Sequence, residues 1–202
     1  MPSTITAEKA ALRASVKEFY NTGIDRRKSD HLLLERFLSL PQVEAALSLL
    51  LFYGTGTEPD TGALLEPLLA LGKTVALPRC LPGRRMEARV YRGKEHLTPG
   101  PFGIPEPDMT CPILARDAAA LILVPNLLCD RRGYRLGQGG GYYDRYLAGF
   151  QGFTVALCRD ALLRDEIPTQ PHDVPVQLVV TETRSLSPDR AERSGAFAPL
   201  PM

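Results

Sequence analysis

Residues 46–53 read ALSLLLFY, and seven of these eight residues are apolar. The run is followed at 54–62 by GTGTEPDTG, which is rich in residues that form turns. A short, continuously apolar run that ends in a turn is typical of a strand buried on both faces. Such strands occur in parallel sheets that helices cover on both sides, so this stretch predicts an α/β fold.

The same pattern recurs along the chain, as expected for alternating strands and helices. Further buried strands are predicted at 73–78, 120–125, 153–158 and 177–182. Helices are predicted over 6–23, 29–40, 62–71 and 141–149. The expected N-caps are Thr6, Ser29 and Thr61, and the expected helix ends are Gly23, Pro41 and Gly72. Pro67 should bend or shorten the third helix.

Residues 79–119 interrupt the alternation. The segment carries five prolines between Pro99 and Pro112 and one possible hairpin strand at 86–92. We predict an ordered loop beside a site, and no second domain.

Composition favours one soluble globular domain over residues 1–202, with a loosely held tail after about residue 187. Hydrophobic residues make up 44% of the chain and charged residues 23%. The formal net charge of +1 gives no overall field that would recruit nucleic acid or a membrane surface. No apolar run approaches the roughly 20 residues that span a bilayer, and no signal core is present near the first residues. We therefore expect a cytoplasmic monomer whose partners are small molecules.

The four cysteines contain no Cys-x-x-Cys pair, and only three histidines are available to complete a zinc set. Reduced thiols are therefore predicted, and a structural zinc site is not.

The segment 124–147, VPNLLCDRRGYRLGQGGGYYDRYL, carries the strongest functional signal. Five of the nine residues from Gly133 to Gly141 are glycine, between a predicted strand and a predicted helix. Ligands of α/β sheets bind at such corners, and glycine amides at a helix start can cradle an anion. Asp144 is placed to hold a phosphate-bound Mg²⁺. The arginines around the corner suit phosphate recognition and are Arg131, Arg132, Arg135 and Arg145.

The known glycine motifs do not match this segment. A P-loop needs Gly-Lys-Ser/Thr, and here Tyr142 and Tyr143 follow Gly141. A dinucleotide fingerprint needs glycine where Tyr142 stands. The segment is therefore interpreted as a phosphate site of another type.

The segment RRGYRLGQGGGYYDRYL closely resembles the motif of the 5-formyltetrahydrofolate cyclo-ligase family. Other motifs of that family follow in the expected order over roughly residues 6–182. They are Lys9-x-x-x-Arg13, GTGTEPDT at 54–61, GKTVALP at 72–78, FGIPEP at 102–107 and HDVPV at 172–176.

The resemblance implies a three-layer α/β sandwich with a mostly parallel sheet, similar to ribose-5-phosphate isomerases and CoA transferases. It also implies an ATP- and Mg²⁺-dependent closure of 5-formyltetrahydrofolate to 5,10-methenyltetrahydrofolate, with release of ADP and phosphate. ATP would phosphorylate the formyl oxygen, and N10 of the folate would then attack the activated carbon. Because the substrate supplies the nucleophile, the absence of a nucleophilic triad in the sequence fits this chemistry.

The resemblance also implies roles for particular residues. Arg135 and Tyr142 would be catalytic, and Asp144 would bind the metal. ATP would contact Lys9, Arg13, Arg135, Leu136, Gly137, Gln138, Gly139, Gly140, Gly141, Tyr142 and Tyr143. The folate would contact Tyr53, Glu58, Gly139, Gly140, Gly141 and Tyr142. Lys9 and Arg13 are four residues apart and share one helix face, so both can reach one ligand.

The chain departs from the family pattern at Gln177, where a second metal-linked aspartate is usual. Glutamine brings no negative charge, so Mg²⁺ should be held less tightly, and Asp173 is a partial substitute. Phe102 is available for stacking, whereas Glu106 is interpreted as a surface charge and His172 as a structural loop residue.

Two other functions remain open from the residues alone. One is a sugar-phosphate isomerase or CoA transferase with the same fold, although no carboxylate or lysine base stands out beside the glycine loop. The other is a non-catalytic relative that binds nucleotide, folate or RNA, to which Gln177 gives some weight.

Overall fold

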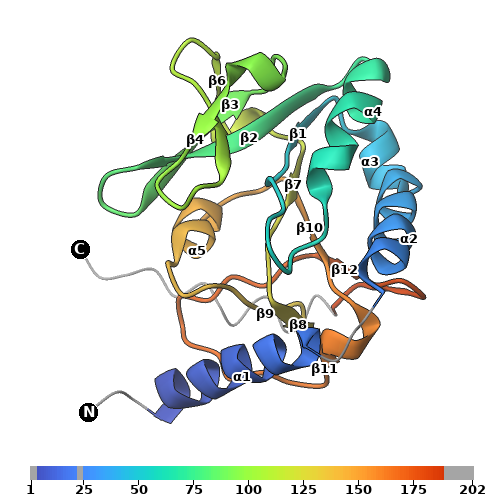
Figure 1. Ribbon diagram of the computed structural model, residues 1–202, viewed down its shortest axis with the longest axis vertical. Helices are drawn as coiled ribbons and strands as arrows, with labels where there is room; N and C mark the ends of the chain where they lie inside the picture. The colour runs from blue at the N-terminus through green and yellow to red at the C-terminus, as the bar shows by residue number, and fades with distance from the viewer. Residues whose placement is uncertain (1–3, 22–24, 189–202) are drawn as a thin grey trace.

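A central sheet of eight strands, in the order β13-β12-β10-β7-β1-β2-β3-β6, organises the fold (Figure 1). The computed structural model describes residues 4–21 and 25–188. Five strands are parallel to one another, namely β1 (Ser48–Leu50), β2 (Thr74–Leu81), β7 (Leu121–Leu123), β10 (Phe153–Leu157) and β12 (Leu178–Val180). Three antiparallel strands complete the edges, namely β3 (Arg85–Val90), β6 (Ile113–Leu114) and β13 (Ser185–Leu186).

Helices cover both faces of this sheet. On one face lie α2 (Arg26–Leu38), α3 (Pro41–Ala45), the 3₁₀ turn Thr61–Leu64 and α4 (Leu65–Ala70), and on the other lie α1 (Thr4–Tyr20) and α5 (Tyr142–Leu147) (Figure 1). Alternate residues of one strand serve the two layers, because Leu49 and Leu51 pack with the first group and Leu50 with the second. The predicted three-layer α/β architecture with a mostly parallel sheet is confirmed.

A second, smaller sheet lies within the corner that contains the glycine loop. It consists of β11 (Leu163–Arg164), β8 (Leu128–Asp130) and β9 (Arg135–Leu136), in that order. Residues 124–141 therefore form a short hairpin followed by the loop, whereas the sequence suggested one loop between a strand and a helix. Strands of only two or three residues give too little periodicity to be read from sequence.

The proline-rich segment 79–119 is more ordered than the predicted loop. β2 runs on to Leu81 and pairs with β3, which confirms the hairpin strand predicted at 86–92. β6 then adds to β3, while β4 (Leu97–Pro99) and β5 (Pro105–Pro107) form a separate two-stranded ribbon. The segment therefore extends the sheet, in contrast to the loop excursion that was predicted.

Helix positions agree with the sequence, but several boundaries differ. Thr6 lies inside α1, and Gly23 lies outside the described residues. Asp25 is the N-cap of α2, because its carboxylate accepts the Lys28 N–H, whereas the predicted cap Ser29 is a buried position one turn further on. Pro41 ends no helix and instead begins α3, where a missing N–H has no cost.

The third predicted helix is divided as its proline suggested. A 3₁₀ turn precedes α4, and Pro67 sits in the first turn of α4, where its ring is tolerated. The predicted loose tail lies beyond residue 188 for most of its length, outside the described residues. Within the described residues, no helix is both long enough and apolar enough to cross a membrane.

Candidate active site

The glycine loop, residues 137–141, links β9 to α5 and has the backbone shape that only glycine adopts without strain. Gly139 has φ 96° and Gly141 has φ 66°, both in the left-handed region. Gly141 also occupies the N-cap position of α5. The positive φ angles that the glycine cluster suggested are therefore present at two positions of this loop.

Two cations of α1 make contacts with distant parts of the chain, and one of them, Arg13, binds the glycine loop. The Arg13 Nε donates to the Gly137 carbonyl at 2.9 Å. Its guanidinium also lies beside Gly139, where an added Cβ would come within 3.3 Å of Nη2. The Lys9 Nζ lies 2.5 Å from the Asp173 Oδ2, and both side chains are largely buried. Helix α1 is thus fastened to the glycine loop and to the segment that leads into β12.

Arg135 and Asp144 form a second ion pair beside the first. The Arg135 Nη2 lies 2.9 Å from the Asp144 Oδ1, and the arginine side chain is 4% exposed. The other end of the guanidinium, Nη1, donates to the Val174 carbonyl. The Val174 N–H in turn donates to the Asp144 Oδ1 at 3.3 Å. Arg135 and Asp144 therefore hold β9, α5 and the segment around Val174 together.

The two ion pairs bring together side chains that are far apart in the sequence. Asp173 and Val174 are adjacent, so the pairs Lys9–Asp173 and Arg135–Asp144 meet at one segment. Each pair offers one cation and one carboxylate. An anionic polyphosphate can take the cations, and Mg²⁺ is a hard cation that prefers the oxygens of such carboxylates. The residues present therefore fit a nucleotide with its metal.

Aromatic side chains close one side of the glycine loop. The rings of Phe102 and Tyr142 meet edge to face, with centroids 6.0 Å apart and an interplanar angle of 87°. The Arg145 guanidinium lies 6.0 Å from the centre of the Tyr142 ring and donates to the Gly140 carbonyl at 2.6 Å. Phe102 is 64% exposed, so one face of this aromatic pair remains open for stacking.

Three residues that were predicted to contact ATP differ from one another in their exposure to solvent. Leu136 is 1% exposed and packs in the core, and its carbonyl accepts the Leu127 N–H. The Tyr143 ring also packs against the buried residues of both faces of the sheet. Its buried hydroxyl has no hydrogen-bond partner among the described residues. Gln138, in contrast, is exposed at the tip of the loop. Any contact of Leu136 with ATP would have to come from its backbone.

A hollow, which we call the Glu58 cleft, lies between the loop after β1 and the start of α2. Its volume is about 500 Å³. Its lining residues are Arg26, Arg27, Asp30, Gly54, Thr55, Gly56, Glu58 and Asp60. Burial raises the pKa of Glu58, and a hydrogen bond from the Thr55 N–H at 3.2 Å partly offsets this. The cleft therefore holds a partly desolvated carboxylate between arginines.

Tyr143 lies at the start of α5, directly after the glycine loop. Its pKa is raised by burial and, secondarily, by the charge of Glu58. Tyr53, predicted to line the folate pocket, is partly buried, and its ring lies 3.2 Å from the Cβ position of a side chain at Gly62. Tyr53 and Tyr143 pack against the same part of the core.

Several sequence interpretations are wrong. Arg131 pairs with Asp165, and Arg132 pairs with Asp130 and Glu166, so neither arginine points to the glycine loop. The hairpin turn at 130–133 orients both side chains away from the loop.

Glu106 is no surface charge, because it is only 5% exposed. It lies beside Cys80, whose pKa burial and the Glu106 carboxylate raise to about 12.

Gln177 lies directly before β12. Its N–H donates to the Thr154 carbonyl and hydroxyl, at 3.1 and 3.0 Å, beside the first residues of β10. It lies three residues beyond Val174, which contacts Asp144. His172, on the other side of Asp173, is exposed.

Arg26 and Arg27 line the cleft but were not predicted from the sequence. Their only sequence signal is a basic pair directly after Asp25 at the start of a helix. Asp173 was predicted only as a partial substitute, yet its carboxylate binds Lys9 and accepts the Gln170 N–H at 2.7 Å.

Known proteins match this chain along most of its length. The family model described as "5-formyltetrahydrofolate cyclo-ligase family" matches residues 5–182. A 5-formyltetrahydrofolate cyclo-ligase of Mycolicibacterium smegmatis is 40% identical over 65% of this chain and 71% of its own length. One of Escherichia coli is 30% identical over 74% and 85%. The solution structure of Aquifex aeolicus 5,10-methenyltetrahydrofolate synthetase superposes with a TM-score of 0.78 at 28% identity, over 89% of this chain and 92% of that one.

Proposed function

The chain belongs to the 5-formyltetrahydrofolate cyclo-ligase family, a family of ligases, and from this premise we propose that it converts 5-formyltetrahydrofolate and ATP into 5,10-methenyltetrahydrofolate, ADP and phosphate. The observation that carries the proposal is a glycine loop with two left-handed residues that Arg13 contacts, next to the ion pairs of Lys9 and Arg135, which meet at residues 173–174. These are groups that bind polyphosphate.

The ATP triphosphate is proposed to bind along the glycine loop. Lys9 and Arg13 would contact it from α1, and the main-chain N–H groups of residues 137–141 would bind its oxygens. Arg135 would face the phosphoryl group that is transferred, because its planar guanidinium can bind two oxygens at once. To do so, Lys9 and Arg135 would exchange their carboxylate partners for phosphate oxygens.

Asp144 and Asp173 are the carboxylates that would then hold Mg²⁺ together with the nucleotide. Bound there, the metal would neutralise part of the charge on the phosphates during transfer. Since Lys9 and Arg135 would at that moment bind phosphate, the exchange leaves no carboxylate and no cation of this corner unpaired.

The reaction requires no nucleophile from the protein. The formyl oxygen attacks the terminal phosphorus of ATP, and ADP leaves. N10 of the same folate then attacks the formyl carbon and loses its proton, and the C–O bond breaks to release phosphate. The protein's part is to align the two substrates and to stabilise charge, for which Arg135 and Tyr142 are the proposed catalytic residues.

The pterin is proposed to bind in the Glu58 cleft. Its ring carries N–H donors along one edge, and the Glu58 carboxylate accepts such bonds. Phe102 and Tyr142 would stack beside the formyl group, with Tyr53 on the other side. We further propose that the protein works as a cytoplasmic monomer on these small molecules, without a nucleic acid or membrane partner.

The proposal is tested by mixing the purified protein with ATP, Mg²⁺ and 5-formyltetrahydrofolate and following the near-ultraviolet absorbance of the methenyl product. We expect product and ADP in equal amounts, each dependent on the other substrate. ADP without methenyl product would indicate an unrelated ATPase. Folate binding without turnover would indicate a non-catalytic relative.

A further inference from the structure

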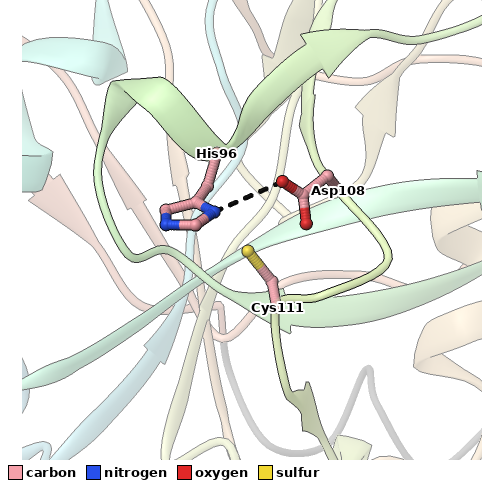
Figure 2. Close-up of side chains that lie close together, drawn as sticks. All are labelled: His96, Asp108 and Cys111. Atoms are coloured by element: carbon pink, nitrogen blue, oxygen red, sulfur yellow. Dashed lines mark hydrogen bonds and ion pairs between the residues drawn. The ribbon is translucent and has the colours of Figure 1, made fainter.

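Three side chains with metal-binding atoms lie close together outside the glycine-loop segment. His96 ends a 3₁₀ turn (Lys94–His96), Asp108 follows β5, and Cys111 precedes β6. Figure 2 shows the Cys111 sulfur pointing toward the gap between the His96 ring and the Asp108 carboxylate. The proposed folate and ATP sites use none of the three.

The spacing of the three ligand atoms is close to that of a tetrahedral site. The His96 Nδ1 and the Asp108 Oδ2 are 3.3 Å apart in a hydrogen bond that a metal would replace, and every pair of ligand atoms lies within 4.8 Å. With zinc bonds of ordinary length at tetrahedral angles, the ligand atoms are separated by about 3.3–3.6 Å. The nitrogen–oxygen edge therefore already has its final length, and the sulfur needs a small rotation or shift.

The surrounding groups hold the ligands in place. The second carboxylate oxygen of Asp108, Oδ1, accepts the Thr110 N–H at 2.7 Å and the Thr110 hydroxyl at 2.5 Å. This leaves Oδ2 to face His96. Outer hydrogen bonds of this kind orient metal ligands in proteins.

The turn that carries Cys111 is also held by Arg89 of β3. The Arg89 Nη1 donates to the Met109 and Cys111 carbonyls, at 3.0 and 2.6 Å. The Glu87 carboxylate lies 2.6 Å from the Arg89 Nε and balances its charge, which lowers the repulsion that a bound cation would meet. The Asp108 N–H donates to the His96 carbonyl at 2.8 Å, so the backbone also joins two of the ligands.

We propose that His96, Asp108 and Cys111 bind one transition-metal ion of the zinc type, with water in the fourth position. Nitrogen, oxygen and thiolate ligands in a tetrahedral set favour Zn²⁺ over Mg²⁺ or Ca²⁺. Cys111 is 1% exposed, whereas the side chains of His96 and Asp108 are 31% and 26% exposed, so water can reach the site from their side.

The sequence predicted reduced thiols and no structural zinc site, because it contains no Cys-x-x-Cys pair, whereas the proposed set has a single cysteine.

A metal at this position would fasten the ribbon of β4 and β5 to the edge of the sheet. Residues 97–107 leave and return at the proposed site, and they carry Phe102, whose ring touches Tyr142. The metal would therefore stabilise the loop that forms one wall beside the glycine loop. It would have a structural role and take no part in the proposed chemistry.

The test titrates Co²⁺ alone into tag-free, metal-free protein and records the near-ultraviolet charge-transfer band of a cobalt–thiolate bond. We expect one equivalent to bind and Zn²⁺ to displace it. The Mg²⁺ carboxylates Asp144 and Asp173 have no thiol beside them in the contacts described, so cobalt bound there gives no such band. Zn²⁺ should also raise the melting temperature of the wild-type protein.

Three variants locate the metal. Cys111→Ser should abolish the band, and His96→Gln, at a partly exposed position, should weaken binding at least tenfold. Cys80→Ser, which replaces a free cysteine outside the cluster, should leave the band unchanged. The absence of a band at stoichiometric cobalt in folded wild-type protein would overturn the proposal, as would a band that survives in His96→Gln with unchanged affinity. Because His96→Gln removes no buried group, it remains informative if Cys111→Ser fails to fold.

Discussion

The glycine-loop corner and the Glu58 cleft hold similar numbers of charged side chains but arrange them differently. At the corner, Lys9 and Arg135 each have a carboxylate partner, in the pairs Lys9–Asp173 and Arg135–Asp144, and Arg13 donates to the Gly137 carbonyl. In the cleft, Arg27 and Glu58 form no ion pair within the described residues, although both face the same hollow.

This difference follows from the ligand that each region is proposed to bind. A metal–nucleotide complex brings both signs of charge, so paired groups at the corner can exchange partners without leaving a buried charge alone. A pterin is neutral and brings hydrogen-bond donors. Its donors need an acceptor that has no ion-pair partner. Such an acceptor is costly to bury, and burial raises the pKa of Glu58.

The largest effect is expected from Arg135→Ala, which removes the more buried of the two ion-paired cations at the corner. Turnover should fall about 10²–10³-fold, because the transferred phosphoryl group loses its guanidinium. The loss is read as the initial rate of methenyl product at saturating ATP and folate. Asp144 would also be left unpaired, so the folded fraction is checked by circular dichroism at the assay temperature.

Arg131→Ala is the matched control for this variant. Arg131 is in the same segment, but its pair with Asp165 is exposed, and such pairs contribute little. Its rate should stay within about twofold of the wild type. Equal losses in the two variants, or a near-normal rate in Arg135→Ala, would remove the proposed role of the corner.

Lys9→Ala should weaken ATP binding with a smaller effect on turnover. One charge-assisted hydrogen bond contributes about 1.5–3 kcal/mol, which corresponds to a rise of roughly 10–100-fold in the KM for ATP. The KM for folate should be unchanged. Lys17→Ala, in the exposed last turn of the same helix, is the control and should behave as wild type. A rise in both KM values would mean that Lys9 only anchors α1.

The contrast between the two regions could be predicted only in part from the sequence. Parallel strands and their helices were predictable because runs such as 46–53 are apolar throughout and bounded by turn residues. The glycine loop was predictable because clustered glycines are costly except where the backbone needs them. Helical spacing predicted that Lys9 and Arg13 share one helix face, and only the resemblance to the family suggested that this face contacts ATP.

The remaining features depend on contacts between distant parts of the chain. The direction of Arg132 is set by Asp130 and Glu166, and the burial of Glu106 follows from the ribbon of β4 and β5. Neither has a local pattern. The same is true of the Lys9–Asp173 pair, whose members are 164 residues apart. Sequence periodicity gives no information on such pairings.

Glu58→Gln tests the cleft and should affect folate alone. Replacing the charged acceptor should raise the KM for 5-formyltetrahydrofolate about tenfold, because a hydrogen bond to a charged group is lost, and leave the KM for ATP unchanged. Glu44→Gln, at an exposed position, should change neither constant. An altered KM for ATP would mean that the cleft and the corner are not separate subsites.

The same variant should be more stable than the wild type at neutral pH. Burial raises the pKa of Glu58 in the folded state, so the ionised form costs stability above that pKa, and glutamine removes the cost. The gain in melting temperature should vanish as the pH falls below about 4.3, the ordinary pKa of glutamate, where the carboxyl is protonated in both states. A gain that persists at low pH would trace to packing, and no gain at neutral pH would mean that Glu58 is well solvated.

The smallest effect is expected from Gln177→Asp, which adds a carboxylate near the paired corner. The backbone of residue 177 is held by its two bonds to Thr154, so the side chain can change without moving β12. An added negative charge would favour Mg²⁺ and should lower its half-maximal concentration about two- to threefold, well under the effect of a direct ligand. Gln177→Asn shortens the side chain equally and adds no charge, and it should leave the requirement unchanged. If the aspartate variant needed as much Mg²⁺ as the wild type, Gln177 would have no part in the metal site, and Asp144 and Asp173 would be its carboxylates without help from β12.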